Sequence, residues 1–309
     1  MTFQDVEFAR KAYWESLKNR LIASVFASLV VGLIFSIGYN IYLNFFPAML
    51  FSIVITMVVF ALAAGIVIFF AREKAVAYRK AYKAYFVEQN FRKIFNNLSY
   101  SHQSGLDLKV LKDTGMINTG DVYSSNDLTI AEYKKVGFAQ ADVHIQNETT
   151  DSEGHTHYVT IFKGRFMIFE FPKQFNFKLE LVGKKFRAYS VPKRDSGTGR
   201  KMVKINTESD EFNHTFKIFG QDGFEAFYLL DPAMIVKIQA IAEHYNGRIF
   251  FGFLDNKMLV AIDDGKDSFE PPRWPSKPID EKTEMKKVSD EIKVITDFVD
   301  VLSLAPIFS

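Results

Sequence analysis

Four side chains in the middle of the sequence could hold a metal ion: His144, Glu148, His155 and His157. They flank the turn-forming stretch TTDSEG, residues 149–154, which separates two segments of strand-like composition. If these strands pair symmetrically about the turn, Val159 lies opposite His144, and His155 lies opposite Glu148. All four side chains then share one face, because residues two apart in a strand point the same way. Histidine and carboxylate are suitable zinc ligands, whereas polar residues at a hairpin tip are more commonly just solvated.

Two loop motifs have simpler structural explanations. The stretch SGTGRK, residues 196–201, lacks the spacing of a phosphate-binding loop and lies between expected strands, so we predict a hairpin loop. Asp263, Asp264 and Asp267 form an acidic turn. A cation bound there would need further oxygen ligands from elsewhere in the chain.

Enzyme chemistry finds little support in the sequence. Glu225 and Asp231 could be paired carboxylates, but helix capping by Asp231, with Pro232 in the first turn, is a simpler explanation. No HExxH, GxSxG or GxGxxG motif occurs. The 309 residues include no cysteine, which excludes disulfides, thiolate metal sites and cysteine nucleophiles and fits a reducing compartment. We therefore predict no catalytic residue and no cofactor.

A long apolar block determines the class of protein. Residues 21–71 contain no Asp, Glu, Lys or Arg, and one membrane span needs about 20 residues. We predict two transmembrane helices within residues 21–70, the first over residues 21–41 and the second over residues 48–70. Asn40, Asn44 and Pro47 supply the turn, and aromatic side chains flank it at Tyr39, Tyr42, Phe45 and Phe46. The spans carry no ionisable residue, which disfavours a transporter.

Basic residues flank both spans and predict their orientation. Arg10, Lys11, Lys18 and Arg20 precede the first span, and the second is followed by Arg72, Lys74, Arg79, Lys80 and Lys83. The connecting segment has no basic residue, so the positive-inside rule predicts a cytoplasmic (inner) membrane protein with both termini in the cytoplasm. The five residues after the second span are candidates for contact with anionic lipid headgroups. A simpler interpretation is that they only set topology and solvate one helix face.

Helices are expected on the cytosolic side of both spans. Residues 1–20 are predicted to form a short amphipathic helix, and residues 71–97 a basic juxtamembrane helix. Tyr78, Tyr82 and Tyr85 recur at helical spacing and so share one face. We predict a packing seam there, against the N-terminal helix, the last helix or a second copy of the chain. Small residues at positions 61–65 could also bring two copies together.

Residues 98–309 are predicted to form a cytosolic α+β domain with a mostly antiparallel sheet or small barrel, closed by a helix from about Glu281. Residues 98–124 are expected to be a linker with a short helix or turn. Strands are expected at residues 128–148, 155–171, 177–183, 186–192, 214–220 and 248–262, the last segment being a hairpin with its turn at Asp255–Asn256. Gly164 marks a bulge or a close approach of backbone. Both faces are apolar from Met167 to Phe169, which predicts burial on both sides or a bulge.

Four segments resemble a bacterial family with two N-terminal spans and one cytosolic domain of unknown function: residues 162–175, residues 210–232, residues 247–262 with 269–271, and the final helix ending VDVLSLA. The resemblance implies this architecture and no assigned activity. Members of that family are often encoded near LemA-family membrane proteins, which implies a candidate partner.

Together these features predict a membrane-anchored, non-enzymatic binding or scaffold protein. The alternatives are an enzyme, which would need a deep pocket with convergent polar groups, and an accessory subunit of a membrane complex. Expected partners are the lipid bilayer and another membrane protein or a second copy. The net charge of +2 gives no case for nucleic acid.

Overall fold

The computed structural model describes residues 1–43, 47–172, 174, 177–189, 201–221, 226–227 and 229–302. The chain forms two compact units. We call residues Met1–Val87 and Glu270–Lys286 the stalk unit, and residues Glu88–Phe269 and Lys287–Ser309 the sheet unit.

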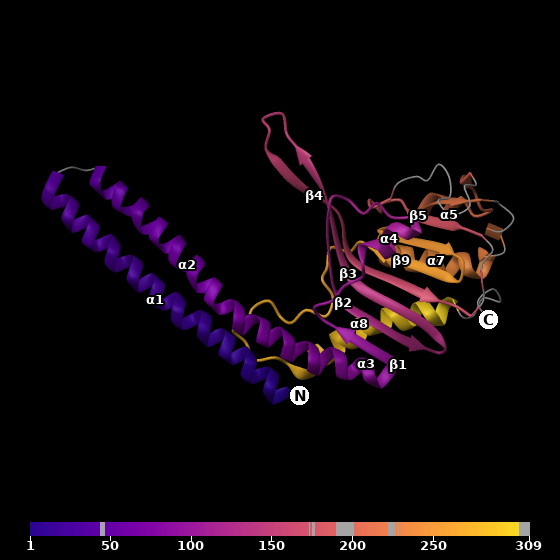
Figure 1. Ribbon diagram of the computed structural model, residues 1–309, viewed down its shortest axis with the longest axis horizontal. Helices are drawn as coiled ribbons and strands as arrows, with labels where there is room; N and C mark the ends of the chain where they lie inside the picture. The colour runs from indigo at the N-terminus through magenta and orange to yellow at the C-terminus, as the bar shows by residue number, and fades with distance from the viewer. Residues whose placement is uncertain are drawn as a thin grey trace. The chain divides into compact units, whose positions relative to one another are not determined.

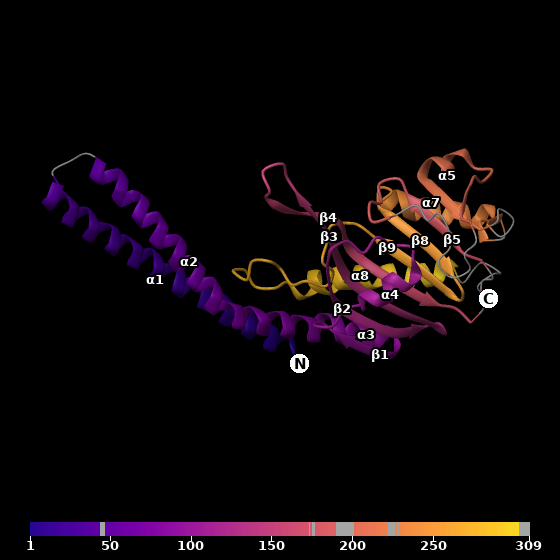
Figure 2. The same ribbon diagram turned by 45° about the horizontal axis from the view of Figure 1, so that its top comes forward.

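The stalk unit is built on two long helices, α1 (Phe3–Leu43) and α2 (Pro47–Tyr82), which run side by side (Figures 1 and 2). The expected N-terminal helix and first span are therefore parts of one continuous helix. By length and composition, Phe3–Ile34 could cross a membrane. A second span arises if Ile53–Val67 and Ala71–Ile94 are counted together across a bend of 41°. Asn44, which was predicted for the turn, and the flanking aromatic residues Phe45 and Phe46 lie outside the described residues.

The juxtamembrane helix ends earlier than predicted. After α2 comes a π-helical turn, η1 (Lys83–Glu88), and then α3 (Gln89–Ile94). Phe95 is the C-cap and has extended backbone dihedrals, with φ −107° and ψ 141°. Asn96 already begins a strand. Residues 95–97 are therefore not helical, because the chain turns into the sheet there.

The sheet unit contains nine antiparallel strands in the order β1-β2-β3-β4-β9-β8-β5-β7-β6. Their bounds are β1 Asn96–Ser101, β2 Val122–Tyr133, β3 Val136–Thr150, β4 Thr156–Glu170, β5 Leu179–Gly183, β6 Val203–Ile205, β7 Phe216–Gly220, β8 Ile249–Leu254 and β9 Lys257–Ile262. The remaining helices are α4 Leu108–Thr114, α5 Asp210–Thr215, α7 Pro232–His244 and α8 Glu281–Leu302. The predicted α+β class with a mostly antiparallel sheet is confirmed. Within the described residues the sheet is open, with β1 and β6 at its edges, and the barrel alternative is wrong.

Both faces of the sheet are covered. On β4, Phe166 and Ile168 belong to a core cluster that includes Leu111 of α4. Met167 and Phe169 point the other way and are fully buried, with the Phe169 ring 6.2 Å from that of Phe298 on α8. The apolar run at residues 167–169 is thus explained by burial on both sides. The residues that lie between members of this core cluster along a strand point to the opposite face, which α8 covers.

The structure contains several of the features that the sequence predicted. Asp231 is the N-cap of α7, and its side chain accepts a hydrogen bond of 2.8 Å from the Met234 amide. β8 and β9 form the predicted hairpin, and α8 begins at Glu281 as expected. Gly164 is a position of close approach, because a Cβ atom added there would lie 2.0 Å from the carbonyl oxygen of Ile262.

Other boundaries were predicted wrongly. Residues 98–124 contain the expected short helix, α4, but they also contain most of β1 and the start of β2, so they are not a linker. The predicted strand at 128–148 is two strands joined by Lys134 and Lys135, whose positive φ angles of 49° and 67° are those of a tight hairpin turn. Residues 186–189 are not in a strand, and residues 190–192 lie outside the described residues. β7 starts two residues late because α5 precedes it.

Candidate functional site

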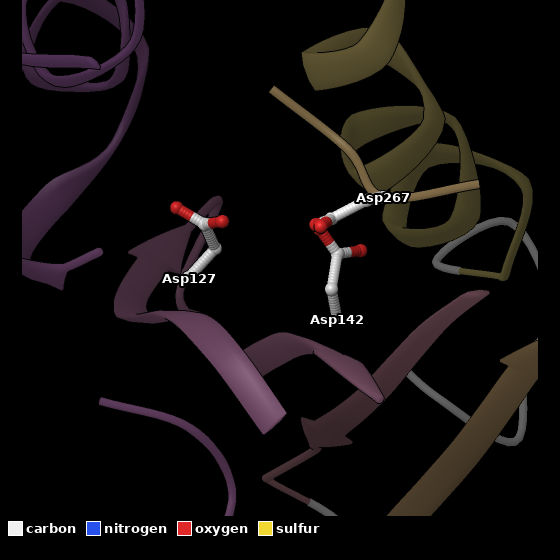
Figure 3. Close-up of side chains that lie close together, drawn as sticks. All are labelled: Asp127, Asp142 and Asp267. Atoms are coloured by element: carbon white, nitrogen blue, oxygen red, sulfur yellow. The ribbon is translucent and has the colours of Figure 1, made fainter. Parts of the chain in front are cut away.

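Three aspartates from separate parts of the sheet unit come together on the α8 face of the sheet: Asp127, Asp142 and Asp267 (Figure 3). One carboxylate oxygen from each lies within 4.8 Å of the other two. Asp127 is on β2, Asp142 is on β3, and Asp267 is in the loop that follows β9. Among the residues that the structure describes, this is the one group of at least three His, Cys, Asp or Glu side chains with that spacing. We call it the aspartate cluster.

A β-bulge positions Asp127. The register of β2 against β3 shifts between Asn126 and Thr129, and Asp127 has a φ of 58°, which is uncommon for a residue with a side chain. The side chain is fully buried. Its Oδ1 accepts a hydrogen bond of 2.6 Å from the Tyr100 hydroxyl, and its Oδ2 accepts one of 2.8 Å from Asn126 Nδ2. The bulge therefore fixes the direction of the carboxylate.

Asp142 is a buried carboxyl group with one oxygen lacking a donor. Its Oδ2 accepts a hydrogen bond of 2.6 Å from the Ser268 amide, whereas Oδ1 has no hydrogen-bond partner among the residues that the structure describes. The residue is 5% exposed. Burial raises the pKa of Asp142 to about 8, and the nearby Arg165 guanidinium partly opposes that rise. An ionised Asp142 is thus costly unless a cation neutralises it.

Asp267 connects the cluster to solvent. Its side chain is exposed, and its Oδ1 accepts a hydrogen bond of 3.1 Å from the same Asn126 amide group that contacts Asp127. The other two acids of the predicted turn face elsewhere. Asp263 accepts a hydrogen bond from the Lys163 amide and Asp264 accepts one from the Lys266 amide, at 3.1 and 3.0 Å. Of the three acids in this turn, Asp267 is the one whose carboxylate lies close to those of Asp127 and Asp142.

Arg165 holds the loop that carries Asp267. It is directly opposite Asp142 in the β3–β4 pairing and is 6% exposed. Its Nε donates to Ser268 Oγ at 3.2 Å, and its Nη1 donates to the carbonyl of Glu291 on α8 at 2.7 Å. The guanidinium carbon lies 5.0 Å from the centre of the Phe269 ring. These contacts fix residues 267–269 between the sheet and α8.

The four predicted metal-ligating residues are placed differently from the expectation. Glu148 pairs with Tyr158 and not with His155, because the turn is made by residues 151–155 and puts Thr150 opposite Thr156. The symmetric register is therefore wrong. His144 lies 3.0 Å from Thr160 Oγ1, whereas His155 and His157 contact Asp151 at 3.3 and 3.1 Å at the tip of the β3–β4 hairpin, which extends as an arm (Figures 1 and 2). The zinc hypothesis depended on the symmetric register, and the strands pair in a different one.

The predicted tyrosine seam makes contacts within the stalk unit. The Tyr78 ring stacks on Tyr13 of α1 at 6.2 Å. The Tyr82 hydroxyl donates to Glu284 at 2.6 Å, and the Tyr85 hydroxyl donates to Glu281. The seam thus faces both the N-terminal helix and the first turns of α8.

The predicted lipid-contact residues divide into two groups. Arg72, Lys74 and Lys80 are exposed. Lys83 is buried, with its Nζ 2.5 Å from Glu270, and Arg79 contacts the other oxygen of the same carboxylate at 3.0 Å. Contact of Lys83 with a membrane surface is therefore a wrong expectation, because its charge is neutralised inside the protein.

Two further contacts attach α1 to residues 275–279 in the stalk unit. Glu7 pairs with Arg10 at 2.8 Å and accepts a hydrogen bond of 2.9 Å from the Ile279 amide. Arg10, only 3% exposed, also donates to the Pro275 carbonyl. The hydrogen bond from Arg10 lowers the pKa of Glu7 below its usual value.

A cavity of about 540 Å³ lies between α7 and α8 in the sheet unit. Its lining combines apolar side chains such as Ile241 and Phe298 with polar groups from both helices, among them His244 and Lys293. Of the other sequence candidates, Glu225 and residues 196–200 of the SGTGRK stretch lie outside the described residues.

The sequence contained signals for the cluster that the pattern analysis missed. Asn126–Asp127 is a turn-like dipeptide inside a strand-like run, which is a typical sign of a bulge. Arg165 interrupts an apolar stretch, as a buried counter-charge does. No local pattern links Asp142 to either residue, because the contact depends on the pairing of strands.

Comparison with known proteins identified a family domain and a similar solved structure. A DUF3137 domain, described as a protein of unknown function, is found at residues 160–304. No match was found among curated proteins. The crystal structure of the mycobacterial trehalose monomycolate transport factor A, TtfA, is similar with 10% sequence identity and a TM-score of 0.38, covering 73% of this chain and 94% of that one. A likeness at that level carries no argument about function.

Proposed function

We propose that the chain is a membrane-anchored, non-enzymatic binding or scaffold protein. α1 and α2 cross the cytoplasmic membrane, and the sheet unit works on the cytoplasmic side. The observation that carries the proposal is the exposure of apolar side chains along the charge-free part of both helices, such as Phe26, Leu33 and Phe69 at 70%, 62% and 69%. Apolar surface on this scale is costly in water and stable in lipid.

The distribution of charge supports the orientation. Basic residues flank the apolar block at both of its ends, and residues 21–71 carry no charge, so both termini are assigned to the cytoplasm. Arg72, Lys74 and Lys80 are exposed just beyond the second span, where they can attract anionic headgroups. A LemA-family protein, suggested by the family resemblance, is the first membrane partner to test, beside a second copy of the chain.

The cavity between α7 and α8 favours a second candidate function, an enzyme or receptor for a small molecule. Its volume of about 540 Å³ is within the range of ligand sites, and polar groups converge on it from two helices. Binding of a small molecule without turnover is equally compatible with the scaffold role.

The absence of cysteine from the sequence makes topology directly testable. Single cysteines would be introduced by Asn44→Cys, in the connecting segment, and by Lys112→Cys, at an exposed position of the sheet unit. A membrane-impermeant maleimide should label only Asn44→Cys in intact spheroplasts and only Lys112→Cys in inverted vesicles. The unmodified chain, which has no thiol, is the background control.

Labelling of both sites from the same side would contradict the double-span topology. Extraction of the chain by alkaline carbonate would contradict membrane insertion altogether. The scaffold role is tested by crosslinking in native membranes followed by mass spectrometry. A stoichiometric membrane partner is expected, and recovery of this chain alone counts against the scaffold and subunit roles.

A further inference from the structure

We propose that the aspartate cluster of Asp127, Asp142 and Asp267 binds one hard divalent cation of about the size of Ca²⁺. The site lies wholly within the sheet unit. It therefore goes beyond membrane anchoring, and its failure would leave the proposed topology untouched.

The unpartnered oxygen of Asp142 points to a missing ligand. Buried carboxylate oxygens almost always accept a hydrogen bond, since an unpaired buried oxygen loses its interaction with water and gains nothing in return. Within the described part of the chain, Asp142 Oδ1 has no hydrogen-bond partner although the residue is 95% buried, and the carboxyl group faces that of Asp267 (Figure 3). A cation between the two carboxylates would provide the interaction that Oδ1 lacks.

The kind of cation follows from the donor atoms and their spacing. All three ligands are carboxylate oxygens, which suit Ca²⁺, Mg²⁺ or Mn²⁺ and not the softer metals. The three oxygens all lie within 4.8 Å of one another, so a single ion can contact all of them. Mg²⁺ demands near-ideal octahedral geometry and gives up its water reluctantly, whereas Ca²⁺ accepts irregular sets of oxygen ligands, such as this set from two strands and a loop.

The surroundings allow the ion to enter and the site to stay in place. Asp267 is exposed and gives a path from solvent, while the other two carboxylates are buried. Tyr100 and Asn126 orient Asp127 by hydrogen bonds, as neighbouring groups commonly orient metal ligands. Water molecules would complete the shell, because Ca²⁺ takes six to eight oxygen ligands.

The same geometry could instead be held by a proton shared between Asp142 and Asp267. That arrangement is neutralised without an ion, and the raised pKa of Asp142 is compatible with it. The two explanations differ in one respect: only the cation site gives saturable metal binding.

Terbium luminescence tests the proposal in the full-length protein in detergent, since Tb³⁺ replaces Ca²⁺ and is excited through a nearby tyrosine. The Tyr100 hydroxyl is 2.6 Å from Asp127, so bound Tb³⁺ should luminesce strongly. We expect a saturable signal that Ca²⁺ displaces at concentrations at least tenfold lower than Mg²⁺. Tyr100→Phe should reduce the luminescence and also weaken Ca²⁺ binding measured by calorimetry, because it removes a hydrogen bond that orients Asp127.

Matched variants separate the cluster from ordinary surface acidity. Asp267→Asn, at an exposed position where folding is not at risk, should weaken Tb³⁺ and Ca²⁺ binding at least tenfold, as should Asp142→Asn. Asp264→Asn removes a charge from the same loop outside the cluster and should change the affinity less than twofold. The absence of saturable binding at millimolar Ca²⁺, or equal losses in Asp264→Asn and Asp267→Asn, would overturn the proposal in favour of the shared proton.

Discussion

At the scale of single residues, close packing of backbone makes some positions intolerant of any side chain. Gly164 lies in β4 against β9, where the carbonyl oxygen of Ile262 would be 2.0 Å from an added Cβ atom. That oxygen belongs to the backbone of a central strand and cannot move without disturbing the sheet. Gly137, in the neighbouring strand β3, has nothing within 4 Å of such an atom.

Gly164→Ala should therefore destabilise the sheet unit by about 1–3 kcal/mol, the usual cost of overpacking. Gly137→Ala is the matched control and should change stability by less than about 1 kcal/mol, because its methyl group has open space. Denaturant unfolding followed by tyrosine fluorescence measures both. Equal stabilities for the two variants would show that the strands separate easily at Gly164.

At the scale of elements, the stalk unit depends on contacts between segments far apart in the chain. Glu7 of α1 accepts the Ile279 amide, and Arg10 donates to Pro275. These polar contacts are buried or partly buried, and so their loss is more costly than that of exposed ion pairs. The loop at residues 271–279 is attached to α1 by them.

Acid should loosen that attachment. The pKa of Glu7 is lowered in the folded state, chiefly by its hydrogen bond with Arg10, so its stabilising effect is complete above the unfolded-state pKa and is lost as pH falls through the folded-state value. The hydrogen-exchange protection factors of residues 275–280, which compare the observed rate with that of the unfolded chain at the same pH, should fall below about pH 4.5.

Glu7→Gln should cause a similar loss of protection at neutral pH, by about fivefold to tenfold, which corresponds to roughly 1–1.4 kcal/mol. Glu15→Gln removes a charge from an exposed position of the same helix and is the matched control. Protection that is the same in both variants would show that Glu7 does not hold the loop.

At the scale of the whole molecule, the proposed position in a membrane rests on the charge pattern and the apolar helices together. Arg72, Lys74 and Lys80 are exposed beyond the second apolar stretch, while Lys83 forms an ion pair with Glu270. Each basic residue near an anionic leaflet contributes about 1 kcal/mol. The exposed three are thus the candidates for headgroup contact.

Replacing Arg72, Lys74 and Lys80 by Gln should reduce the anionic lipid that co-purifies with the protein by at least half. The control replaces Lys112, Lys135 and Lys204, three exposed residues of the sheet unit, and removes the same total charge. Lipid analysis by mass spectrometry compares the two variants. A similar loss in both would indicate general charge attraction and argue against a specific juxtamembrane contact.

The sequence by itself determined features that depend on neighbouring residues. The apolar block, the Asp231 cap of α7, the β8–β9 hairpin and the start of α8 follow from composition, spacing and turn chemistry. Helical spacing also placed Tyr78, Tyr82 and Tyr85 on one face. Each of these signals depends on residues close together in the sequence, so it can be recognised without knowing the tertiary structure.

The tertiary structure alone decided the strand register and the aspartate cluster. The position of the β3–β4 turn, with Thr150 opposite Thr156, moves Glu148 away from His155, and a bulge turns Asp127 towards Asp142 and Asp267. Burial of both sheet faces decides which strands pair. This pairing brings together residues as distant as Asp142 and Ser268, which are 126 positions apart. No periodicity in the sequence records a pairing of that range, because it results from the packing of the whole sheet unit.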